Sequence, residues 1–185
     1  EKNGILMEGK RFEKREEVKR LYEDKIISIG RVTKVTKGGR TFRFSATVVV
    51  GNRKGLVGIG SGKSKEVTDA VNKAIQTANK NVVKVAIVNN RTIPHEAIGK
   101  CGRARVVIKP AKEGRGIVAG GAARAVLELA GVKDIVSKSL GANIKVNVAK
   151  ATLEALKAQR TEARINVLRG KMEAPKEIAE EVGEE

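Results

Sequence analysis

The chain has 185 residues, 41% hydrophobic but only 2% aromatic, so it can bury a core, which must be aliphatic. It carries 38 Lys and Arg against 21 Asp and Glu, and a net charge of +17 predicts a polyanionic partner, nucleic acid, over a merely solvated cationic surface. The single cysteine and single histidine exclude an internal disulfide and a zinc site built from several such residues, and no apolar run is long enough to span a membrane.

Residues 1–24 are dense in charges of both signs, which predicts a charged arm leading into a weakly amphipathic helix. Strands are expected next over 26–35 and 40–50, joined by a turn at Lys37-Gly38-Gly39. In the second strand Phe42 and Phe44 begin an apolar face that we expect to be core. The opposite, polar face, which carries Arg43, is expected to meet water or RNA.

A turn at 51–55 and a short strand over 56–59 precede a helix with apolar residues at helical spacing from Val67 to Ala78, for which Ser64 is the expected N-cap. The order of helix, three antiparallel strands and helix predicts a first α+β unit over 25–81.

A second unit is predicted over 82–170, followed by an acidic tail over 171–185 that we expect to be unstructured. Its expected strands are 82–88, 92–98, 103–108 and 134–140, with a turn at 99–102. A buried helix is expected over 122–130, capped by Gly131, and Asn147 is expected to cap a last helix.

Three motifs suggest catalysis, and each departs from its pattern. The Gly60–Ser64 segment resembles a phosphate loop, but the first glycine of that motif is displaced by one residue, so a nucleotide-dependent enzyme is only the alternative prediction. The Gly114-x-Gly116 pair does not follow directly on a strand, as a dinucleotide fingerprint requires. His95 and Cys101 have no evident third group to orient them as a catalytic pair. We expect no enzyme activity and no cofactor.

Glycines beside cations predict turns in which backbone amides and side chains contact phosphate together. The scarcity of aromatics favours recognition of the shape and backbone of folded RNA over stacking on single-stranded bases. The predicted RNA-binding residues are Lys34, Lys37, Gly38, Gly39, Arg40, Arg43, Arg53, Lys54, Lys63, Lys65, Lys112 and Arg115.

Several segments, in order and at matching spacing from Lys25 to Gly170, resemble the bacterial-type small-subunit ribosomal protein number five family. They are Val35–Arg40, Val57–Lys63, Thr92–His95, Lys109–Ala111 and Gly116–Val132. The resemblance implies a first domain similar to a double-stranded-RNA-binding domain, and a second β-α-β-α domain with a left-handed crossover.

The resemblance also implies a role in the small ribosomal subunit, where the family binds rRNA near the decoding region and the messenger entry channel and supports assembly and translational accuracy. It makes Lys37–Arg40 the tip of a hairpin that reaches into rRNA. It implies that Lys100, Cys101, Gly102, Arg103 and Arg105 face small-subunit protein number four, and that the second domain meets protein number eight. The ribosome concerned is expected in the cytoplasm, with an organelle as the alternative.

Overall fold

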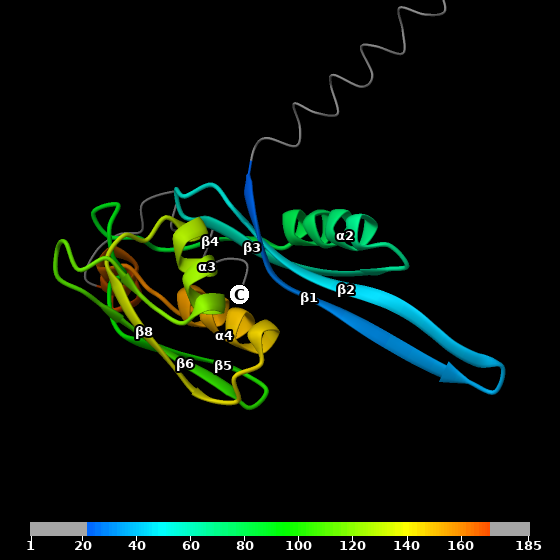
Figure 1. Ribbon diagram of the computed structural model, residues 1–185. Coiled ribbons are helices and arrows are strands. Elements are labelled where there is room, and N and C mark those ends of the chain that lie inside the picture. The colour runs from blue at the N-terminus through cyan, green and yellow to red at the C-terminus, as the bar shows by residue number, and fades with distance from the viewer. Residues whose placement is uncertain (1–21, 171–185) are drawn as a thin grey trace, which may run out of the picture.

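The structure, a computed structural model, describes residues 22–170, and the arm, its predicted helix and the acidic tail lie outside or almost outside that range. The fold is mixed α+β, as predicted, and the described residues form two four-stranded sheets (Figure 1). The first sheet has the order β1 (Glu23–Thr36), β2 (Gly39–Gly51), β3 (Leu56–Ser64), β4 (Val82–Lys84). Glu23 and Asp24, predicted as part of the arm, already belong to β1.

β1 and β2 form the antiparallel hairpin that their β-branched residues predict. The two strands stay paired up to Thr36 and Gly39, so Lys37 and Gly38 alone form the turn. Gly39 has a φ of +144°, a backbone conformation that favours glycine. The predicted strands over 26–35 and 40–50 and the turn between them are confirmed.

Helix α2 (Val67–Lys80) lies directly on β3, and the glycines of β3 make that close approach possible (Figure 1). A Cβ atom built on Gly60 would lie 2.1 Å from the Ala74 carbonyl oxygen, and one on Gly62 would lie 2.4 Å from that of Ala70. Ala70 and Ala74 are fully buried in the predicted apolar stripe of the helix. The prediction that β3 ends at residue 59 is wrong, because the glycines extend the strand beneath the helix to Ser64.

Ser64 is therefore the last residue of β3 and not the N-cap of α2. That position is taken by Glu66, whose side chain makes no capping hydrogen bond. The Ser64 hydroxyl instead donates to Asp69 Oδ2 at 3.5 Å and accepts from Lys73 Nζ at 3.3 Å. These contacts tie the end of β3 to the helix that covers it.

The prediction that the polar face of β2 is exposed to water is also wrong near the end of that strand. Thr47 is only 3% exposed and Val49 is fully buried. Helix α3 (Gly121–Ala130), from the second half of the chain, covers this face, so β2 is buried on both sides there. The alternation of the sequence describes one strand, and it does not reveal that a distant helix packs on its polar side.

The second sheet has the order β5 (Ala97–Cys101), β6 (Ala104–Pro110), β8 (Ile135–Gly141), β7 (Ile117–Val118). β7 is parallel to β8, and α3 connects them; the handedness of this crossover stays a prediction. Helices α3 and α4 (Lys145–Lys157) lie between the two sheets (Figure 1), where one aliphatic cluster joins both halves of the chain. Gly131 caps α3 in the left-handed conformation at φ +93°, as predicted.

Several predicted boundaries in this half are wrong. The strand expected over 82–88 is only β4, and it pairs with β3 in the first sheet. The hairpin turn lies at 102–103, because Lys100 and Cys101 pair with Arg105 and Ala104. Asn147 lies inside α4, whose N-cap is Ile144, and the short β7 and α5 (Glu162–Leu168) were not predicted. Within residues 22–170, the helices lack the length and the apolar content that a membrane span requires.

A turn of the first half docks on the end of α3. The Arg53 amide donates to the Leu129 carbonyl at 3.0 Å, and the Gly55 amide donates to that of Ala130 at 2.9 Å. These carbonyls belong to the last turn of a helix, where such oxygens have no intrahelical donor. The turn after β2 therefore connects the two halves of the molecule.

Candidate RNA interface

The β1–β2 hairpin extends beyond the rest of the first sheet as a two-stranded ribbon (Figure 1). The ribbon is here defined as the exposed residues 29–43, of which 29–31 lie opposite residues of β2 that also pair with β3. β3 pairs with β2 only from Phe44 to Gly51, so the strands farther out have only each other. Every residue of the ribbon is exposed. Because packing does not determine its side chains, their chemistry is available to a partner.

The ribbon carries positive charge on both faces and no negative charge. Residues directly opposite each other in an antiparallel pair point to the same side, so Lys34 and Arg43 share one face and Arg31 and Arg40 share the other. Lys37 is in the turn, and from Lys25 to Lys65 the sequence contains no acidic residue. The ribbon can therefore contact phosphates on either side.

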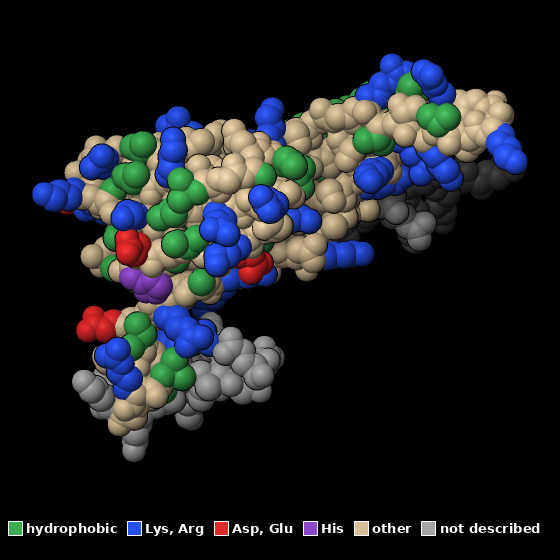
Figure 2. All heavy atoms as spheres, turned by 90° about the horizontal axis from the view of Figure 1, so that it is seen from below, with side chains coloured by type: hydrophobic (Ala, Val, Ile, Leu, Met, Phe, Trp, Pro, Cys, Tyr) green, Lys and Arg blue, Asp and Glu red, His purple; other side chains and the backbone are tan. Residues whose placement is uncertain are grey.

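Gly38 and Gly39 leave the tip of the ribbon open, because no atom lies within 4 Å of a Cβ built on either residue. A phosphate can approach the backbone amides here together with the side chains of Lys37 and Arg40. The structure thus places four predicted residues, Lys37–Arg40, at one projecting end, together with Lys34 and Arg43 a few residues back along the two strands. Figure 2 shows Lys and Arg side chains at the end of the ribbon on the face seen from below.

Lys63 and Lys65 are exposed at the end of β3 and just after it. Lys63 is directly opposite Ser45, so its side chain shares the face that carries Arg43 and Lys34. The structure therefore brings this pair of lysines to the base of the ribbon, although the glycines beside them serve to pack α2.

Arg53 and Lys54 lie at the opposite end of the first sheet, where Glu23 is paired with Gly51. The Arg53 guanidinium makes a 2.6 Å ion pair with Glu23, and its backbone is docked on α3. Lys54 is exposed in the same turn. These two residues do not lie on the ribbon, and the turn that carries them docks on α3 of the same chain.

Lys112 and Arg115 project from the loop between β6 and β7, which a buried carboxylate holds in place. Asp134, only 5% exposed, accepts from the Gly116 amide at 2.9 Å and from Arg91 Nε at 3.1 Å. The Gly116 hydrogen bond is the main cause that lowers the pKa of Asp134, and Arg91 lowers it further. Arg91 also makes a 2.7 Å ion pair with Glu113, and this bond is the main cause that raises the pKa of Arg91.

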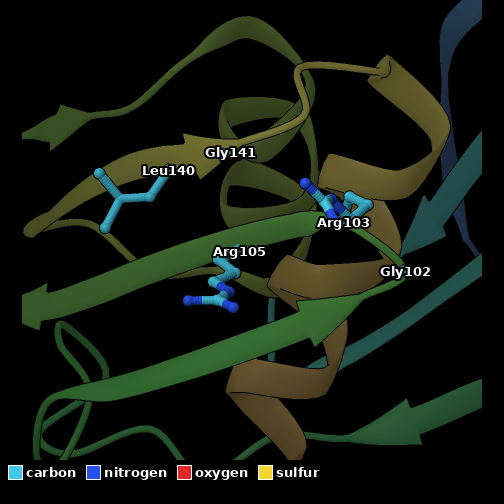
Figure 3. Close-up of a pocket in the computed structure, with 5 residues that line it drawn as sticks. All are labelled: Gly102, Arg103, Arg105, Leu140 and Gly141. Carbon is cyan, nitrogen blue, oxygen red and sulfur yellow. The ribbon is translucent and has the colours of Figure 1, made fainter.

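The predicted protein-facing residues form the β5–β6 hairpin at the edge of the second sheet. Lys100 and Arg105 are directly opposite each other and exposed, whereas Cys101 is half-buried against the core. A hollow of about 360 Å³ is lined by Arg105 and Leu140 on neighbouring strands and by Gly102, Arg103 and Gly141 near the turn (Figure 3). The hairpin offers positive charge beside an exposed aliphatic side chain.

The catalytic alternatives have no matching geometry. Gly60–Ser64 is a strand covered by α2 and not a loop, so its amides cannot wrap a phosphate. The Gly114 and Gly116 segment is part of the loop that Asp134 holds. The His95 ring nitrogens lie 2.9 Å from the Glu96 carbonyl and 3.3 Å from the Arg160 amide, both backbone groups.

Two features escaped the sequence analysis. Phe42, expected in the core with Phe44, is 42% exposed, and Arg31 lies over its ring. The residues that hold the Lys112 loop, Arg91 and Asp134, are 43 positions apart, and no local pattern joins them. Phe42 lies two residues farther out than Phe44, and its exposure can be predicted only when the end of β3 is known.

Family models match both halves of the chain. The model described as Ribosomal protein S5, N-terminal domain, matches residues 22–86, which include the ribbon, α2 and β4. The model described as Ribosomal protein S5, C-terminal domain, matches residues 99–169, which include the second sheet and its helices.

Proposed function

The chain belongs to the ribosomal protein S5 family, and we propose that it binds rRNA through the β1–β2 ribbon near the decoding region and the messenger entry channel. Membership of this family makes it a structural, RNA-binding protein of the small ribosomal subunit that takes part in translation. The proposed contact supports subunit assembly and translational accuracy.

One observation carries the proposal: the ribbon is an exposed projection with cations on both faces, an open glycine tip and no acidic residue. A structural protein rarely extends such a hairpin into water, because an isolated two-stranded hairpin is marginally stable. RNA supplies the missing contacts, since each phosphate it brings pairs with a Lys or Arg side chain and releases a counterion.

The length of the ribbon suits a contact inside folded RNA. Arg31 is opposite Phe44, so at roughly 3.3 Å per residue the five steps from Arg31 to Thr36 reach about 17 Å beyond Phe44, a length of the same order as the width of an RNA helix. Lys63 and Lys65 extend the positive charge to the base of the ribbon. Lys112 and Arg115, fixed by Asp134, add a second cationic site on the other half of the molecule.

The protein contacts that we propose use the second half of the chain. The β5–β6 hairpin, with Lys100, Cys101, Gly102, Arg103 and Arg105, faces small-subunit protein number four. The second sheet and its helices meet protein number eight. A cytoplasmic ribosome is the proposed location.

The experiment compares the binding of wild-type protein and variants to small subunits that lack this protein. The double variant Lys37→Glu/Arg40→Glu should leave the subunits at a clearly lower salt concentration than the wild type, because two phosphate contacts become repulsive. Lys80→Glu, at an exposed position at the end of α2 that lies away from the ribbon, is the control and should behave as wild type. Release of both variants at the wild-type salt concentration would contradict the proposal.

A further inference from the structure

Phe42 is the point at which the apolar face of β2 leaves the cover of α2. On this face Phe44 is half-buried against the cluster formed by β2 and α2, while Phe42, two residues farther out, is 42% exposed. Its direct neighbour on β1 is Thr33, which is too small to cover a phenyl ring. The fold therefore presents an aromatic ring on a projecting ribbon.

Arg31 lies over this ring, with Cζ 3.7 Å from the ring centroid. Both side chains come from the same face, because Arg31 is opposite Phe44 and therefore diagonal to Phe42. Arg31 is exposed, so the pair places a planar cation and an aromatic ring together in water. Such a pair is suited to stacking on a third planar group.

The charges around the pair decide which planar group this is. Arg40 lies on the same face, Lys34 and Arg43 lie on the opposite face, and no acidic residue occurs between Lys25 and Lys65. A second copy of this chain would bring the same positive charge and be repelled. A nucleobase brings a phosphate with it, and bases that leave a helix commonly stack on aromatic rings and on guanidinium planes.

We propose that Arg31 and Phe42 form a stacking site for one unpaired nucleobase in the RNA that the ribbon binds. The inference rests on the proposed function and deepens it, because phosphate contacts alone carry no information about where along an RNA the ribbon binds. A stacked, unpaired base gives the ribbon a preference for a bulge or loop over a continuous helix. Thr33, directly opposite Phe42, leaves room beside the ring on the same face for such a base.

The test compares two RNA probes: a fully paired duplex, and the same duplex with one unpaired 2-aminopurine in its centre. The wild type should bind the bulged probe roughly 5- to 150-fold more tightly, as expected for one stacked base, and the 2-aminopurine fluorescence should be quenched on binding. Phe42→Leu, which keeps an apolar side chain, should lose the preference and the quenching while it keeps its affinity for the duplex. Arg31→Lys, which keeps the charge without the plane, should reduce the preference.

Phe42→Tyr is the matched control, because it keeps a ring of the same size and should retain the preference. Thermal unfolding of each variant checks the fold, and exposed positions on the ribbon should leave it unchanged. Equal affinity for both probes, or a preference that Phe42→Leu retains, would overturn the stacking site and leave the phosphate contacts intact. Failure of Lys37→Glu/Arg40→Glu to weaken binding to either probe would instead overturn the proposed function.

Discussion

Two segments of this chain look alike in sequence and have different uses in the structure. Thr36–Arg40 and Gly58–Ser64 each combine glycines with cations, and the predicted RNA-binding residues include Lys37–Arg40 in the first and Lys63 in the second. In the first, the glycines form the open tip of a projecting ribbon. In the second, they form a buried strand whose missing Cβ atoms allow α2 to lie on the sheet. A glycine beside a lysine can therefore serve either an open turn or the close packing of a helix on a strand. The two cases differ in whether another element packs against the glycine.

The largest expected difference between the two segments is in the free energy of unfolding of glycine variants. Gly60→Ala puts a Cβ atom against the Ala74 carbonyl and the Ala78 amide, so α2 must move or the strand must shift. We expect the free energy of unfolding in urea to fall by about 1–3 kcal/mol, the usual cost of overpacking.

Gly38→Ala is the matched control, since its Cβ would meet nothing within 4 Å. Its free energy of unfolding should stay equal or rise by about 0.4–1 kcal/mol, because alanine restricts the unfolded chain. Equal stability of the two variants would show that the close packing of α2 on β3 is wrong.

The elements that local pattern determines were predicted well. The β-branched runs of β1 and β2, the alanine stripe of α2 and the Gly131 cap follow from short-range rules. Burial by distant elements was not predicted: Thr47 and Val49 are buried on the face of β2 that packs toward α3, and β4 joins the first sheet. The same distinction applies to the candidate site. The tip residues Lys37–Arg40 form a local turn and were predicted, whereas the exposure of Phe42 depends on where β3 and α2 end and was not.

The second prediction compares the RNA affinity of the two segments. Arg40→Glu, on the ribbon, should weaken binding to a duplex RNA by about tenfold at moderate salt, because a phosphate contact becomes repulsive. Lys63→Glu, at the base of the ribbon, should weaken RNA binding less than Arg40→Glu, since the RNA contacts mainly the outer part of the ribbon. A larger loss for Lys63→Glu, measured by filter binding, would move the centre of the interface to β3.

A third glycine-and-cation segment, Lys112–Gly116, is held by a carboxylate and should therefore respond to acid. The pKa of Asp134 is lower in the folded chain than its unfolded value of about 3.9, so its stabilising contribution is complete above that value. It is lost as the pH falls through the lower, folded pKa.

Asp134→Asn keeps the size of the side chain and removes the charge that Arg91 contacts. We expect the variant to be less stable than the wild type at pH 7, with the difference shrinking below about pH 4. Urea unfolding of both proteins across this range measures it. A difference that stays constant with pH would show that the carboxylate charge does not hold the loop.

The smallest effect on RNA affinity is expected at the turn that docks on α3. Lys54→Gln removes an exposed charge from the Asn52–Gly55 turn, which docks on α3 and lies at the far end of the sheet from the ribbon. The RNA affinity of this variant should change by less than about twofold, the effect of a distant surface charge at moderate salt. A loss as large as that of Arg40→Glu would show that this end of the sheet also contacts RNA.

The salt dependence of RNA binding tests most directly whether the ribbon contacts phosphates. Each phosphate that the protein neutralises contributes roughly 0.7–0.9 to the slope of log K against log salt concentration. The neutral variant Lys37→Gln/Arg40→Gln should therefore bind with a slope shallower than the wild type by roughly 1.4–1.8, twice that contribution. An unchanged slope would mean that these side chains do not contact the RNA backbone, and the account of the ribbon would be wrong.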